Sequence, residues 1–180
     1  MLAQVHRNLE WLLEWVVIIL MVALTVVVIV GVCYRIAGNS LSWYDEVASV
    51  QLAWITYYGA ALAALKRRHI GFDTVLLALP PALRKLGVIV GEALVIGFFA
   101  LMAWAGMEVL TVLEGMSLVS LTWVPIQLTQ SVIPIGAALF ILCELVSLPG
   151  YWRMTADGVS LEHADIEEEV EHELKKAGEY

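Results

Sequence analysis

The sequence predicts an all-α integral membrane protein with four transmembrane helices, and three observations support this. Of the 180 residues, 61% are hydrophobic and only 16% are charged, whereas a soluble domain has roughly 45–50% and about 25%. Four apolar segments are each long enough to cross a bilayer, which takes about 20 residues of helix. Lysine and arginine gather in one of the short loops between these segments, as they do in membrane proteins of fixed orientation. We therefore expect lipid to surround most of the side chains.

The predicted spans cover residues 12–34, 43–65, 86–113 and 123–148. Each is expected to be helical throughout, because backbone groups exposed to lipid must form their hydrogen bonds within the segment. Residues 71–83, between the second and third spans, are too short and too rich in proline to cross the membrane. Asp73 can cap a helix there, so we expect a short interfacial helix that ends before Pro80. A packed re-entrant corner is the alternative.

Charge divides the chain into two parts. Residues 1–156 carry eight Lys or Arg and nine Asp or Glu. Residues 157–180 carry only two Lys or Arg but again nine Asp or Glu. We expect a four-helix membrane domain over residues 1–156 and an acidic tail over residues 157–180, either helical or disordered. The few basic residues lie beside apolar spans, so nucleic acid is not an expected partner.

The basic residues of the loops predict the orientation. The loop between spans two and three holds five of them, the first loop holds only Arg35, and the third loop holds none. Since short cytoplasmic loops are enriched in Lys and Arg, the middle loop is expected in the cytoplasm. Both termini of this multi-pass protein are then cytoplasmic too.

Four carboxylates lie within the spans, near their margins: Glu14, Glu92, Glu108 and Glu144. In the third span, two of them are about 12 Å from the central Ala100 at 1.5 Å per residue. Three of the four share the cytoplasmic side with the basic loop, so pairing or snorkelling is the favoured interpretation. Secondary carriers usually bind their substrate near the midplane, which here lacks an ionisable residue. The chain alone therefore resembles a carrier poorly.

Motifs of common enzyme classes do not occur. The sequence has no nucleotide-binding loop, no HExxH, no CxxC and no GxSxG, and its four histidines are scattered over loops and termini. We expect no enzymatic activity, no cofactor and no metal site. The second span has a side rich in small residues, which would let another helix approach closely, inside or outside the chain: Gly59, Ala60, Ala61, Ala63 and Ala64.

Four short motifs occur in a fixed order over about residues 10–150: Trp43-Tyr44-Asp45-Glu46; Trp54 followed by Gly59-Ala60-Ala61; Lys66-Arg67-Arg68-His69-Ile70 with Asp73; and Trp123 to Pro125 followed by Ile133-Pro134-Ile135-Gly136. Their order and spacing resemble the DctQ family, the small membrane subunits of tripartite ATP-independent periplasmic (TRAP) transporters. Two features depart from the family: Asp45-Glu46 stands where paired glutamates are frequent, and the resemblance implies no role for the long acidic tail.

The resemblance implies an accessory or scaffold subunit, in the bacterial inner membrane, of a sodium-coupled secondary transporter that imports organic acids. Its partners would be a larger membrane subunit, which carries out transport, and a periplasmic substrate-binding protein, with membrane lipids around them. Six residues are carried over as subunit-interface or lipid-interface residues: Trp43, Glu46, Arg68, His69, Pro134 and Gly136.

Two alternatives remain open at this point. The chain could be a stand-alone, homo-oligomeric secondary carrier whose site is formed by Gln51, Glu92 or Glu108. It could also be a tetraspan assembly factor unrelated to transport.

Overall fold

The computed structural model describes residues 2–67, 80–157 and 170, and these residues are predominantly helical. The helices are α1 (Leu2–Ile36), α2 (Tyr44–Leu65), α4 (Pro81–Val112), α5 (Ile126–Gln130) and α6 (Val132–Asp157). Four helical stretches are long and apolar enough to cross a membrane, the last of them running through α5 and α6: Gln4–Ile36, Tyr44–Leu65, Leu83–Val112 and Ile126–Arg153. The predicted all-α membrane fold with four spans is confirmed.

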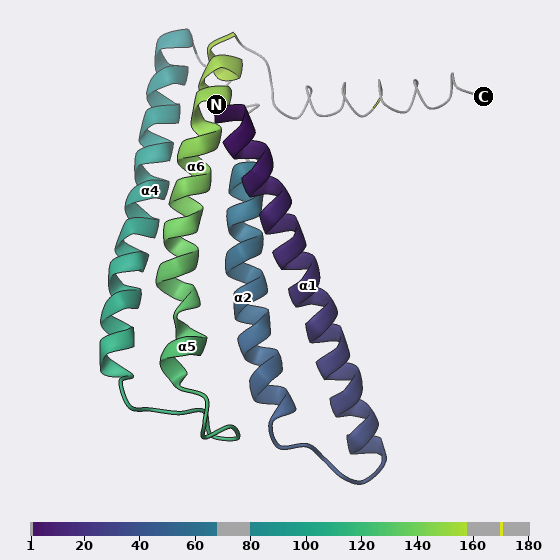
Figure 1. The fold of residues 1–180 in the computed structure, drawn as a ribbon. Coiled ribbons are helices and arrows are strands. Elements are labelled where there is room, and N and C mark those ends of the chain that lie inside the picture. The colour runs from purple at the N-terminus through teal and green to yellow at the C-terminus, as the bar shows by residue number, and fades with distance from the viewer. Residues whose placement is uncertain (1, 68–79, 158–169, 171–180) are drawn as a thin grey trace, which may run out of the picture.

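The helices run up and down the long axis of the molecule (Figure 1). One end, here called the basic end, holds the start of α1, the end of α2, the start of α4 and the end of α6. The opposite end, here called the loop end, holds the connections 37–43 and 113–125. The start of α1 and the end of α6 thus share one end, as four passes require. Which end faces the cytoplasm stays a prediction.

The long helices pack in a row rather than in a square. Helix α6 packs against both α2 and α4, and α1 packs mainly against α2. The outer helices α1 and α4 therefore expose broad apolar faces, for example Ile19 on α1 and Leu94 on α4, which are 60% and 68% exposed. In a membrane, these faces meet lipid or another apolar protein surface.

The fourth span is interrupted, contrary to the expectation of a continuous helix. Helix α5 ends at Gln130, Ser131 follows, and α6 begins at Val132. Pro134 is the third residue of α6 and has no N–H to donate to the carbonyl of Gln130. A continuous helix through this position would therefore lose one backbone hydrogen bond. In the first turn of a helix the missing N–H costs little. The break accordingly precedes the proline by one turn.

Helix α1 also differs from the prediction, because it begins at Leu2 rather than near Leu12. Its additional first turns carry His6 and Glu10, which contact the end of α2, as described below. The expected interfacial helix, which was to end before Pro80, lies outside the described residues, and α4 begins directly after this proline. The acidic tail also lies outside them, apart from Asp157 and Val170.

The core lies in the half of the bundle nearer the basic end. It consists of six buried residues, each at most 4% exposed: Leu13, Ala61, Ala64, Leu65, Phe140 and Cys143. The rings of Phe99 and Phe140 stack with their centroids 3.6 Å apart, which joins α4 to α6. The small side chains Ala61 and Ala64 thus bring α2 close to its own neighbours. Gly59, by contrast, faces open space.

Candidate interaction sites at the two ends of the bundle

Arg67 ends α2 in an unusual backbone conformation. Its φ is 53°, in the left-handed region that L-residues other than Asn and Asp rarely adopt. The N–H of Arg67 donates to the carbonyl of Ala64 at 3.2 Å, which is the hydrogen bond that glycine usually makes when it follows the last residue of a helix. An arginine in this place costs roughly 1–3 kcal/mol of strain. Its side chain must offset that cost.

The Arg67 side chain connects α2 to both α4 and α6. Its Nη1 contacts Oε1 of Glu92 on α4, and Oε1 of Glu144 on α6 at 2.8 Å. Its Nε donates to the hydroxyl of Ser147 at 2.8 Å, and its Nη2 donates to the carbonyl of Glu144 at 3.1 Å. The guanidinium also lies 4.7 Å from the ring centroid of Tyr151. One side chain therefore holds three helices together at the basic end.

This group of residues, here called the Arg67 cluster, is largely removed from solvent. The side chains of Arg67, Glu92 and Glu144 are 14%, 12% and 8% exposed. Two carboxylates share one guanidinium, and the second oxygen of each, Oε2, is buried without a hydrogen-bond partner among the described residues. Charges in such surroundings are stable only when they are paired. Removing the arginine would leave both carboxylates without a cation.

Lys66 forms a second, more exposed connection, from α2 to α1. Its Nζ lies 3.1 Å from Oε1 of Glu10 and also contacts Oε1 of Glu14. The hydrogen bond with the Glu14 carboxylate raises the pKa of Lys66 above its ordinary value, while burial opposes the rise. His6 lies 3.1 Å from the carbonyl of Leu65 through its Nε2. These contacts explain why α1 begins well before its apolar span and includes the polar residues at the start of the chain.

At the loop end, Glu46 binds the backbone of the connection between α4 and α5. Its Oε1 accepts the N–H of Val119 at 2.9 Å, and its Oε2 accepts the N–H of Ser120 at 2.8 Å. The hydroxyl of Ser120 in turn donates to the carbonyl of Ser42 at 2.8 Å. This loop clasp, formed by Glu46, Val119 and Ser120, fixes the connection above the start of α2.

The other interface residues suggested by the resemblance occupy different places. Trp43 is the partly exposed N-cap residue of α2. Its backbone carbonyl accepts the N–H of Val47, one turn further along, at 3.0 Å. Arg68 and His69 lie outside the described residues. The remaining two lie inside the bundle, Pro134 against Gly106 of α4 and Gly136 against Tyr57 of α2. A role of these six residues at a subunit or lipid interface stays a prediction.

The polar residues suggested for a stand-alone carrier do not come together. Glu92 belongs to the Arg67 cluster at the basic end. Glu108 is exposed on α4, 16 residues further along the same helix. Gln51 lies in the first half of α2, nearer the loop end. These three side chains therefore do not form a common binding site.

Arg67 is not among the six interface residues that the resemblance suggested. Those six include Arg68 and His69 of the basic loop, whereas Arg67 forms the cluster with Glu92, Glu144 and Ser147. A usable signal was present: two carboxylates within apolar spans need a cation, and Lys66 and Arg67 are the first basic residues after the second span.

Comparison with known families identifies the chain. The family model of the tripartite ATP-independent periplasmic transporters, DctQ component, matches residues 24–153. The match covers well over half of the sequence and includes both the Arg67 cluster and the loop clasp. Comparison with curated proteins finds no match. The chain therefore belongs to the DctQ family, the small membrane subunits of TRAP transporters.

Proposed function

We propose that this small TRAP subunit is the scaffold of a sodium-coupled secondary transporter that imports organic acids with the help of a periplasmic substrate-binding protein. It stands in the bacterial inner membrane with both termini in the cytoplasm and binds a large membrane subunit that moves the substrate. The family match supports the assignment to this class of transporter. The distribution of charge supports the scaffold role.

The single observation that supports the scaffold role is that the predicted spans offer no Lys or Arg to an anionic substrate. An organic acid is an anion, and its site needs a cation or several hydrogen-bond donors. Residues 36–65 and 86–152 contain no Lys or Arg. Arg67, which lies close to the end of the second span, is already bound to Glu92 and Glu144. The substrate and sodium sites accordingly belong to the large subunit.

The proposed contacts of the scaffold differ between its two ends. Trp43 and the loop clasp face the side on which the substrate-binding protein docks, while Arg68 and His69 face the cytoplasmic lipid headgroups or the large subunit. Pro134 and Gly136 act indirectly, because they set the packing of α6 against α4 and α2. The broad apolar faces of α1 and α4 offer the area that a large membrane partner would cover.

Co-expression with the neighbouring genes tests the proposal. The chain is purified through an affinity tag in mild detergent, and the proteins that accompany it are identified by mass spectrometry. We expect a larger polytopic membrane protein at a fixed ratio. After reconstitution into liposomes, uptake should require both membrane subunits, the binding protein and a sodium gradient. Uptake by this chain alone would refute the proposal.

The loop clasp allows a more local prediction. Replacing Glu46 with glutamine leaves one carbonyl oxygen as acceptor and removes a charge-assisted hydrogen bond. Hydrogen exchange at the amides of Val119 and Ser120 should become faster by about tenfold. Asp45→Asn is the matched control, because Asp45 is exposed and contacts neither amide. Equal exchange in the two variants would contradict the clasp.

A further inference from the structure

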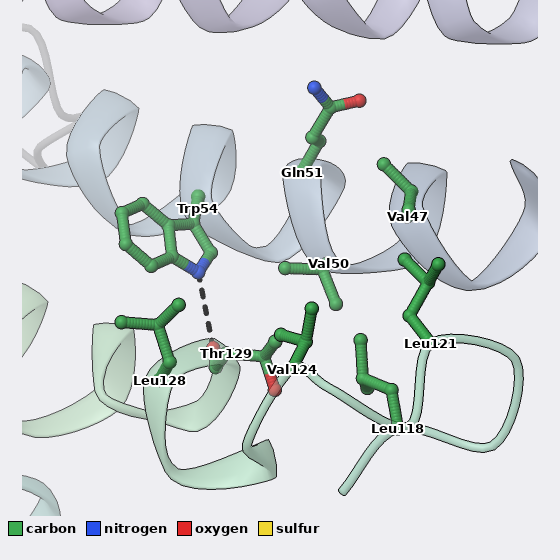
Figure 2. A pocket seen from close by; sticks show the side chains of 9 residues that line it. All are labelled: Val47, Val50, Gln51, Trp54, Leu118, Leu121, Val124, Leu128 and Thr129. Carbon is green, nitrogen blue, oxygen red and sulfur yellow. Dashed lines mark hydrogen bonds between the residues drawn. The ribbon is translucent and has the colours of Figure 1, made fainter. Parts of the chain in front are cut away.

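A cavity of about 190 Å³ lies between the first half of α2 and the segment that leads into α5. Figure 2 shows its two walls: Val47, Val50 and Trp54 from α2, and, facing them, Leu118, Leu121, Val124, Leu128 and Thr129. For comparison, an apolar cavity of roughly 150 Å³ stays free of water and binds benzene. The cavity therefore has room for several methylene groups.

The polar groups in these walls are directed elsewhere. The indole Nε1 of Trp54 donates to the carbonyl of Thr129 at 3.1 Å, and the Thr129 hydroxyl donates to the carbonyl of Ile126 at 2.8 Å. The side-chain amide of Gln51 points away from the α5 wall (Figure 2), and its Oε1 is a single buried acceptor without a hydrogen-bond partner among the described residues. Water needs two to four polar partners in such a place and does not find them here. The occupant must be apolar.

The cavity opens toward the membrane. Leu128, which forms part of its wall, is 58% exposed. The lining residues of α2 lie about 5–15 Å along the helix axis from Tyr44, at 1.5 Å per residue. With a hydrocarbon core about 30 Å thick, this depth corresponds to the leaflet nearest the loop end. The apolar medium at this opening consists of phospholipid acyl chains.

The charges around the loop end determine which phospholipid headgroup is favoured beside the cavity. The described residues there carry four carboxylates and one guanidinium: Asp45, Glu46, Glu108, Glu114 and Arg35. Glu46, in the loop clasp, lies in the first turn of α2 and one helical turn before Val50 of the cavity wall. A headgroup with a net negative charge is repelled in these surroundings, whereas an ammonium group is attracted.

We propose that this cavity binds one acyl chain of a phospholipid whose headgroup carries an ammonium group, such as phosphatidylethanolamine. The acyl chain fills the space between α2 and the α5 wall, and the ammonium group lies near the Glu46 carboxylate. Such a lipid would complete the packing of α5 on α2, which here rests on the hydrogen bond from Trp54 and a few apolar contacts.

Photo-labelling tests this site. The full-length chain is reconstituted, alone and with its co-purified subunits, in vesicles that contain phosphatidylethanolamine with a diazirine in the acyl chain. Labelled peptides are then identified by mass spectrometry. Val50→Trp fills the cavity, and Leu52→Trp is the matched control, because Leu52 is 57% exposed on the same helix and is not part of the wall. Leu121→Trp fills the cavity from its other side, should Val50→Trp not fold.

We expect adducts on residues 118–129, reduced about tenfold by the filling variants and changed less than twofold by Leu52→Trp. A phosphatidylglycerol probe should give several-fold fewer adducts. Labelling that is unchanged by both filling variants, or spread evenly over α1 and α4, would overturn the site. Equal labelling by the two lipids would overturn the headgroup preference. Loss of labelling in the complex would assign the cavity to the partner subunit and overturn the proposal.

Discussion

Replacing Arg67 with methionine is expected to lower the free energy of unfolding by about 3–5 kcal/mol, the usual cost of breaking a buried ion pair on one side only. The substitution leaves the carboxylates of Glu92 and Glu144 buried without their cation. Thermal unfolding in detergent can be monitored by size-exclusion chromatography. The midpoint temperature of unfolding should be lower by roughly 10 °C. This is the largest effect that we expect from a single substitution at the basic end.

Two further variants separate charge from backbone strain. Arg67→Gly also removes the cation but relieves the left-handed backbone conformation, so its loss of stability should be smaller by about 1 kcal/mol. Adding Glu92→Gln and Glu144→Gln to Arg67→Met removes the unpaired charges and should restore a large part of the lost stability. Neither result is expected if the arginine acts only by packing its aliphatic carbons.

The matched control for this prediction is Arg7→Met. Arg7 lies at the same end of the bundle, but it is exposed, and among the described residues it donates only to Gln4, at 2.8 Å. A surface substitution of this kind usually changes stability by less than about 0.5 kcal/mol. Similar losses at residues 7 and 67 would contradict the central role of the Arg67 cluster.

The spans were predictable because a transmembrane helix needs about 20 predominantly apolar residues, and hydropathy along the sequence reports this property directly. The predicted second span, residues 43–65, differs from α2 (Tyr44–Leu65) by one residue at its start. The start of α1 was not predictable in this way, since Glu10 and Glu14 are stabilised there by Lys66 of another helix. The break at Ser131 was indicated by Pro134, but its position depends on which residue begins the new helix.

The charged cluster was predictable in part. Charge and depth placed Glu92 and Glu144 on the same side as the basic loop, and pairing or snorkelling was the favoured interpretation. Choosing Arg67 over Arg68 needs the left-handed turn at the end of α2, which directs the side chain toward α4 and α6. Such a conformation at a non-glycine residue is set by the tertiary contacts and not by the local sequence.

The role of Glu46 within the chain could not be predicted either. A carboxylate in the first turn of a helix is favoured by the helix dipole alone, so the position of Glu46 in the sequence gives no sign of a partner in a distant loop. The structure shows it accepting two backbone N–H groups from residues 73 and 74 positions away in the sequence. The direction of loop N–H groups is not encoded in hydropathy or charge, so no pattern could indicate the loop clasp.

The contact between α6 and α2 leads to the second large prediction, the effect of Gly136→Ala. A Cβ atom at this position would lie 2.7 Å from Cβ of Tyr57, whereas carbon atoms in contact are about 3.5–4.0 Å apart. Because Cβ of Tyr57 is fixed to its backbone, the two helices would have to separate by about 1 Å. We expect a loss of about 1–3 kcal/mol in the free energy of unfolding, even though alanine favours helix formation.

Gly59→Ala is the matched control, and it should have the opposite sign. Gly59 is also a helical glycine, but a Cβ atom there would meet nothing within 4 Å. Alanine should therefore raise stability by about 0.5–1 kcal/mol, through the lower conformational entropy of the unfolded chain. Thermal unfolding of both variants in the same detergent measures the difference.

The same pair of variants distinguishes two roles for the Pro134–Gly136 motif. If Gly136 acts by packing α6 against α2, Gly136→Ala should lower stability and binding to the large subunit together, and conditions that restore stability should restore binding. If Gly136 contacts the large subunit directly, binding should fall while the stability of the isolated chain stays the same. The burial of Gly136 beneath Tyr57 favours the first outcome, because a glycine enclosed within the chain can reach a partner only through the helices that it positions.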